Sequence, residues 1–167
     1  MERKPEKYLV VSFADYSVPE FKETRSGDKF VYYGKDNAYP EYLLSLFNRS
    51  PKHNAIINAK AQFIIGKGFE GITEAVNRFG ETPTQLLKKQ ALDLELHGGF
   101  YVQRIFSKGG GKVEFYHLDY HKVRSNKDNT LFYYKEEGWK DNSSVKDAKT
   151  YKAFDPTRTS GTDVLYF

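Results

Sequence analysis

The sequence contains no cysteine among its 167 residues. Disulfide frameworks and thiolate metal sites are therefore excluded, and an intracellular setting is expected. The first residues, MERKPEKYLVVSF, lack the apolar core of a secretory signal peptide. No apolar run approaches the roughly 20 residues that a membrane-spanning helix needs. These absences favour a chain that folds in water and has no membrane partner.

The composition is that of a globular domain with a mixed surface. Hydrophobic residues make up 39% of the chain and aromatic residues 16%, which is enough to bury a core. The length favours one domain spanning residues 1–167. The net charge of +4 permits an anionic partner, but 22 acidic residues are interleaved with the basic ones. A dedicated nucleic-acid module usually concentrates its basic residues.

Apolar spacing in the first half predicts three helices, over about residues 40–48, 51–65 and 83–97. Pro40, the pair Ser50-Pro51 and the pair Thr82-Pro83 supply the residue types that begin helices. The second helix carries two adjacent apolar stripes and should therefore be broadly buried. The stripes are Ile56, Ala59 and Phe63, and Ile57, Ala61 and Ile64.

Beyond Leu96 the helical spacing gives way to strand patterns, and Gly98-Gly99 mark the change. Two earlier strands are also predicted. The predicted strands cover residues 7–14, 30–33, 100–107, 112–118, 131–135, 150–154 and 164–167. Helices followed by strands indicate an α+β fold, with the helices packed on an antiparallel sheet formed mainly by the second half.

The stretch GKGFEG, Gly66 to Gly71, fits the dinucleotide-binding pattern G-x-G-x-x-G. That fingerprint must follow a strand and open a helix, so that pyrophosphate meets the helix N-terminus. Here the first glycine follows a predicted helix, so no nucleotide cofactor is expected. Gly66 is instead predicted to end the helix with positive φ, in the left-handed conformation, and Gly68 to shape the turn after it.

The stretch HLDYH places His117, Asp119 and His121 at alternate positions near a predicted strand end. Alternate residues of a strand share one face, so the three could ligate a metal ion. They could equally be polar residues that face water. No fourth ligand is close in sequence, and we expect no metal, no other cofactor and no catalytic residues. Asp93 and Glu95, two positions apart on a helix, are expected on a solvated face.

Aromatic residues recur in the predicted strands, in pairs such as Phe115-Tyr116 and Phe132-Tyr133. Such a sheet could stack nucleobases, as single-strand binding proteins do. Four basic residues nearby would then contact phosphates: Arg104, Lys112, Lys122 and Arg124. Packing in a core is the favoured explanation of the aromatics, because strands favour them and half of each strand's side chains must face a core.

Two blocks of the chain resemble the N-terminal part of tailed-phage portal proteins. The first is residues 34–69, GKDNAYPEYLLSLFNRSPKHNAIINAKAQFIIGKGF, and the second is residues 87–124. The shared features are an N-x-Y-P motif, an S-P helix start, a G-x-G-F helix end, a G-G-x-Y-V strand start and an L-D-x-x-K-V-R strand end. Here they are Asn37, Tyr39, Pro40, Ser50, Pro51, Gly66, Gly68, Phe69, residues 98–102, Leu118, Asp119, Lys122, Val123 and Arg124.

The resemblance implies a structural protein of a dodecameric ring at one capsid vertex. Its partners would be further copies of itself, terminase and capsid proteins. Phage DNA would be an indirect partner, because it passes through the ring. Its place would be the virion or the cytoplasm of the host bacterium. The 167 residues would correspond to the wing of a portal protein, as a fragment or truncated relative without stem and clip.

Three functions therefore compete on the sequence alone: a portal-like structural protein without enzymatic activity, a small nucleic-acid-binding module, and a metal-dependent hydrolase. Salt-dependent retention on DNA would favour the second. Metal in the purified protein would favour the third.

Overall fold

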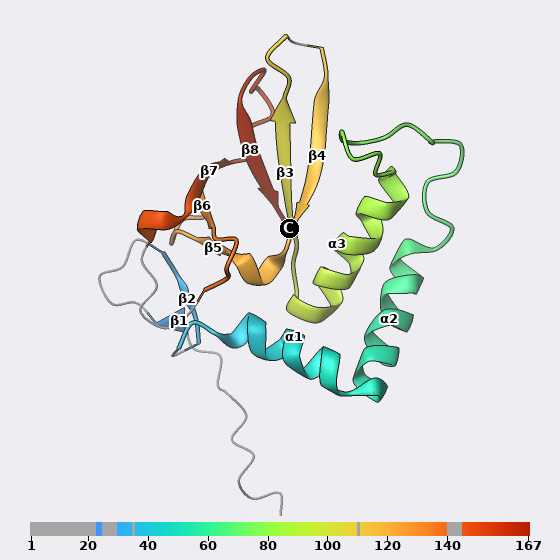
Figure 1. The fold of residues 1–167 in the computed structure, drawn as a ribbon, viewed down its shortest axis with the longest axis vertical. Coiled ribbons are helices and arrows are strands. Elements are labelled where there is room, and N and C mark those ends of the chain that lie inside the picture. Colours follow the sequence, from blue (N-terminus) through green and yellow to red (C-terminus); the bar gives the residue numbers. More distant parts are fainter. Residues whose placement is uncertain (1–22, 25–29, 35, 110, 140–144) are drawn as a thin grey trace, which may run out of the picture.

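The structure is a computed structural model that describes residues 23–24, 30–34, 36–109, 111–139 and 145–167. Over these residues the chain forms three α-helices and then a six-stranded sheet (Figure 1). The helices are α1 (Tyr39–Arg49), α2 (Pro51–Ile65) and α3 (Pro83–His97). The α+β expectation is confirmed, and the predicted helix bounds agree to within one residue.

Local chemistry fixes where two of the helices begin. The Ser50 hydroxyl accepts a hydrogen bond from the His53 amide at 3.3 Å, with Pro51 as the first helical residue of α2. At the start of α3, Thr82 and Gln85 exchange reciprocal side-chain hydrogen bonds of 2.8 and 3.3 Å. Each bond satisfies an amide that the helix itself leaves unpaired.

Six strands form the main sheet in the order β4-β3-β8-β7-β6-β5. They are β3 (Tyr101–Phe106), β4 (Val113–Leu118), β5 (Val123–Ser125), β6 (Leu131–Tyr134), β7 (Lys149–Ala153) and β8 (Thr162–Tyr166). Two short strands, β1 (Glu23–Thr24) and β2 (Tyr32–Tyr33), pair separately. Single 3₁₀ turns occur at η1 (Tyr120–Lys122) and η2 (Val145–Asp147). The strand predicted over residues 7–14 lies outside the described residues.

The main sheet is mixed, whereas the sequence predicted an antiparallel one. Strands β7 and β8 pair in parallel, with Lys152 opposite Asp163 and Ala153 opposite Val164. Residues 154–161 form no hairpin but bring the start of β8 back beside the end of β7, where the Phe154 amide donates to the Val164 carbonyl at 2.8 Å. The other strand pairs of this sheet are antiparallel.

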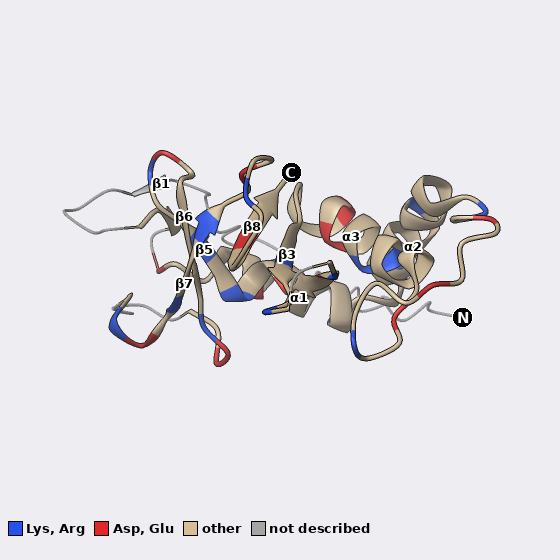
Figure 2. Cartoon of the chain, turned by 90° about the horizontal axis from the view of Figure 1, so that it is seen from above, with Lys and Arg blue, Asp and Glu red and all other residues tan. Residues whose placement is uncertain are grey.

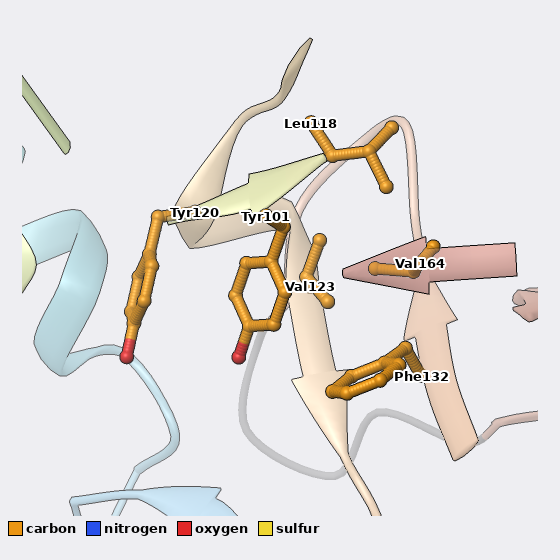
Figure 3. Close-up of a cluster of buried hydrophobic side chains, with 6 residues drawn as sticks. All are labelled: Tyr101, Leu118, Tyr120, Val123, Phe132 and Val164. Atoms are coloured by element: carbon orange, nitrogen blue, oxygen red, sulfur yellow. The ribbon is translucent and has the colours of Figure 1, made fainter. Parts of the chain in front are cut away.

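A buried cluster of apolar and aromatic side chains lies on one face of the main sheet, closed by η1 (Figure 3). Tyr101 and Tyr120 lie side by side in it, and their hydroxyl groups point the same way (Figure 3). The cluster consists of Tyr101, Leu118, Tyr120, Val123, Phe132 and Val164. It fixes the turn that leads into β5.

The three helices pack mainly on one another. One core joins Phe47, Ile57 and Leu96, and a second joins Ala61, Ile65 and Ala91. The expectation that α2 is broadly buried is wrong. Both α1 and α3 lie on the same side of α2, so the stripe of Ile56, Ala59 and Phe63 stays exposed. In the other stripe Ile57 and Ala61 are buried, and Ile64 remains 43% exposed. Among the described residues, no helix is both long and apolar enough to cross a membrane.

Candidate functional site

Asn37 occupies a tight turn directly before α1. Its backbone has a φ of 57°, a conformation that Asn tolerates better than most residues. The side chain is fully buried, and its Oδ1 accepts a hydrogen bond from the Tyr33 amide at 3.1 Å. The turn therefore aims a carboxamide oxygen and a backbone carbonyl into the protein.

Arg124, from β5, fills the space in front of Asn37. Its Nε donates to Asn37 Oδ1 at 2.7 Å, and a terminal nitrogen donates to the Asn37 carbonyl at 2.7 Å. The other terminal nitrogen donates to the carbonyls of His121 and Val123 at 3.0 and 2.8 Å. The side chain is fully buried, so these oxygens replace its water shell.

Aromatic rings and one carboxylate complete the surroundings of the guanidinium. The rings of Tyr33 and Trp139 lie 4.9 and 5.6 Å from its central carbon. Glu41 Oε2 lies 3.5 Å from a terminal nitrogen. Burial lowers the pKa of Arg124, and the charge of Glu41 opposes this, so the guanidinium stays protonated.

The predicted phosphate contacts at Arg124 and Arg104 do not fit this structure. Arg124 is internal and has no exposed surface. Arg104 donates two hydrogen bonds to buried Asp163, at 2.9 and 2.5 Å, and lies between the rings of Phe106 and Phe154. Its side chain is only 12% exposed.

The two lysines of the predicted set differ in exposure. Lys122 binds Asp119 and Glu136 at 3.0 and 3.2 Å, and the hydrogen bond that it donates to Asp119 raises the pKa of Lys122. Lys112 is 64% exposed, with Glu114 at 3.6 Å. Basic and acidic segments alternate over the molecule rather than gathering on one face (Figure 2). A basic sheet face is therefore not assembled from these four residues.

Only two of the three candidate residues of HLDYH come together: His117 Nδ1 lies 3.7 Å from Asp119 Oδ1. Strand β4 ends at Leu118 and η1 begins at Tyr120, so the strand alternation stops before His121. His117 Nε2 lies 2.7 Å from Asp93 Oδ2, while Asp119 pairs with Lys122. Over the described part of the chain, no three His, Cys, Asp or Glu side chains are grouped to hold a metal.

Asp93 was expected to face solvent, but it joins α3 to the sheet. Its side chain is only 13% exposed, and Oδ2 also accepts from the Tyr120 amide at 3.3 Å. Glu95 pairs with Lys60 of α2 and is 17% exposed. Both carboxylates thus hold helices in place, because their partners come from distant parts of the chain.

The motif glycines serve backbone geometry. Gly66 has positive φ as predicted, 53°, but its ψ of −126° is not left-handed helical. This conformation, with the Gly68 amide bonded to the Ile65 carbonyl at 2.8 Å, matches a type II′ turn. Gly98 ends α3 in the left-handed conformation. A Cβ on Gly99 would lie 2.6 Å from the Phe167 carbonyl oxygen, so this position needs glycine.

Two hollows flank the turn that holds Asn37. The larger, about 740 Å³, lies beside α1 and is lined by Glu41 and Trp139 among others. The smaller, about 240 Å³, is lined by Tyr33, Tyr120 and His97, with the two tyrosine hydroxyls 3.2 Å apart. The His97 ring stacks on Tyr120, and burial lowers the pKa of His97 to about 4.

Sequence reasoning missed this cluster of tyrosines around Asn37 and Arg124. Asn37 and Arg124 are each identified as motif residues of the resemblance, but in different blocks. Nothing in the local pattern of either indicates that they touch, because 87 residues separate them.

No protein-family profile and no curated protein sequence matches this chain. Chains of solved structures do match. One is from a structure described as "Neck of empty GTA particle computed with C6 symmetry", with a TM-score of 0.46 and 16% sequence identity. The match covers 77% of this chain and 42% of the other, so this chain spans less than half of that one. At this TM-score the likeness carries no conclusion about fold or function.

Proposed function

We propose that this chain is a structural protein of a tailed-phage particle, corresponding to the wing of a portal protein. In this role it is part of the ring at one capsid vertex, through which DNA is packaged and on which terminase docks. It acts by assembling with other particle proteins, not by catalysis.

The contact between Asn37 and Arg124 carries the proposal. Asn37 is the first motif residue of the first portal-like block, and Arg124 is the last motif residue of the second. Two hydrogen bonds of 2.7 Å join them inside the protein. The first and last motif residues of the resemblance are thus partners in one buried contact, which supports treating the two blocks as one structural unit.

The other motif residues support the proposal by having structural tasks. Ser50 caps α2, Gly66 turns the chain at its end, and Gly99 allows β8 to approach. The charged residues that might have carried chemistry are engaged in pairs, such as His117 with Asp93 and Arg104 with Asp163.

The experiment is quantitative mass spectrometry of particles purified from cells that encode the chain. Its peptides should be present in particles, in far fewer copies than the main capsid protein. Particles from cells in which the gene is deleted should lack packaged DNA. Absence of the chain from purified particles would overturn the proposal. Salt-dependent retention of the purified chain on single-stranded DNA, lost in Lys112→Ala, would favour the nucleic-acid-binding alternative instead.

A further inference from the structure

The outer face of α2 is apolar and exposed. Phe63 has 89% of its surface exposed and Ile56 has 59%. Ala55 and Ala59 are exposed on the same face, because these positions follow one another at helical spacing. We call Ala55, Ile56, Ala59 and Phe63 the α2 stripe. Contiguous apolar surface of this kind on a helix commonly marks a place where a partner binds.

The charge of α2 restricts that partner. The helix contains Lys52 and Lys60 but no aspartate or glutamate. Lys52 is exposed and lies one turn before Ile56, in line with the stripe. Lys60 already pairs with Glu95 of α3. A fitting partner therefore offers an apolar surface together with carboxylates for Lys52.

The groove beside α1 offers the apolar surface. It has a volume of about 740 Å³ and is lined by Ala38, Leu44 and Trp139 among others. That volume falls in the range of about 300–1,000 Å³ that encloses a drug-sized molecule. It is therefore large enough for side chains such as Phe63 and Ile56.

The same groove carries an excess of negative charge. Three carboxylates line it, from Asp36, Glu41 and Glu137, against one arginine, Arg49, and His121. Asp36 and Glu137 are exposed. Glu41 Oε2 is buried and lies 3.5 Å from the buried Arg124, which offsets its charge inside the protein. The exposed carboxylates of the groove are thus opposite in charge to Lys52 beside the α2 stripe.

We propose that the α2 stripe of one chain binds in the groove beside α1 of a second copy. This inference rests on the proposed function as a ring protein. The two surfaces share no residue, so the contact is head-to-tail and can repeat from copy to copy, as a ring requires. Phe63 and Ile56 contact Ala38 and Leu44, and Lys52 faces the exposed carboxylates of Asp36 and Glu137.

The absence of cysteine allows a direct test with the full chain. One variant carries Ala59→Cys, in the stripe, and another carries Ser45→Cys, in the groove. Mixed under mild oxidation, they should form the mixed disulfide about tenfold or more faster than Ala59→Cys does with Lys127→Cys, because docking raises the local thiol concentration. Lys127 is exposed and belongs to neither surface.

Two results would overturn the inference. Equal rates with Ser45→Cys and Lys127→Cys would show no docking in the groove. Faster formation of the Ala59→Cys homodimer would show that two stripes pair with each other. Adding Phe63→Ser to the Ala59→Cys chain should abolish the excess rate. Because Phe63 is exposed, this change leaves the fold intact, which circular dichroism verifies.

The outcome is independent of the test of the proposed function. The disulfide measurement uses purified chain alone, whereas the proposed function is tested in particles. A chain found in particles without the expected disulfide would leave the function standing and remove the interface. If the expected disulfide forms but the chain is absent from particles, the interface stands and the proposed function is refuted.

Discussion

Arg124 and Asn37 form two hydrogen bonds of 2.7 Å, one to the side-chain oxygen and one to the backbone carbonyl of Asn37. Both residues are fully buried. The pair joins the turn before α1 to β5, so the position of the helices relative to the sheet depends on it. Because a buried guanidinium without its acceptors is strongly unfavourable, this contact should be sensitive to substitution.

Asn37→Ala should lower the free energy of unfolding by about 2–4 kcal/mol, because it leaves the charged Arg124 short of one buried acceptor. Urea unfolding measures this. Asn37→Gly also removes the acceptor but tolerates positive φ, so the difference between the two variants isolates the backbone strain at this position. A loss below about 1 kcal/mol in both would contradict the role assigned to the pair.

Gly66→Ala should destabilise the protein by about 1–2 kcal/mol, because an alanine there must adopt a conformation that only glycine populates readily. No neighbouring atom lies within 4 Å of a Cβ at this position, so the effect is one of backbone conformation. Gly109→Ala is the matched control, since Gly109 has neither positive φ nor a close neighbour. Gly66→Ala at wild-type stability would refute the turn.

How far the sequence predicts this molecule depends on the distance between the residues that interact. The helix bounds could be predicted because Ser50, Thr82 and the prolines act within three or four residues. The parallel pairing of β7 and β8 could not, because it depends on the path of residues 154–161. Arg124 could not be placed inside the protein, since its acceptor at Asn37 is 87 positions away. A lone arginine in a strand is more often exposed, and the residues next to Arg124 in the sequence do not indicate that it is buried.

His97 should make stability fall as the pH drops from about 6.5 to about 4. Burial lowers the pKa of His97 from 6.5 to about 4, with Asp93 opposing and the charges of His121 and Arg124 assisting. Between these values the unfolded chain binds the proton and the folded chain does not, so acid favours unfolding. The full effect is about 3 kcal/mol.

The measurement is urea unfolding at several pH values for wild type and His97→Gln. Carboxylates whose pKa is lowered, such as that of Asp119, also lose stabilisation in acid, and the variant keeps them. The difference between the two proteins therefore isolates His97. Parallel stability curves between pH 4.5 and 6.5 would refute the assignment.

The purified protein should contain no stoichiometric zinc or manganese. His117 is hydrogen-bonded to Asp93 and Asp119 is paired with Lys122, so ligation would have to break a hydrogen bond and an ion pair. Elemental analysis after purification without chelator tests this. Stoichiometric metal that disappears in His117→Ala would revive the hydrolase hypothesis and remove the purely structural one.

The last prediction concerns assembly. The chain alone should be a monomer in weak, concentration-dependent exchange with small oligomers at micromolar concentration. A head-to-tail contact through one helix face and one groove is small, and small interfaces are weak. Light scattering across a dilution series measures the mass, and Phe63→Ser should abolish the concentration dependence. A stable dodecamer of the 19.3 kDa chain would contradict the prediction, and would mean that these residues by themselves assemble a ring.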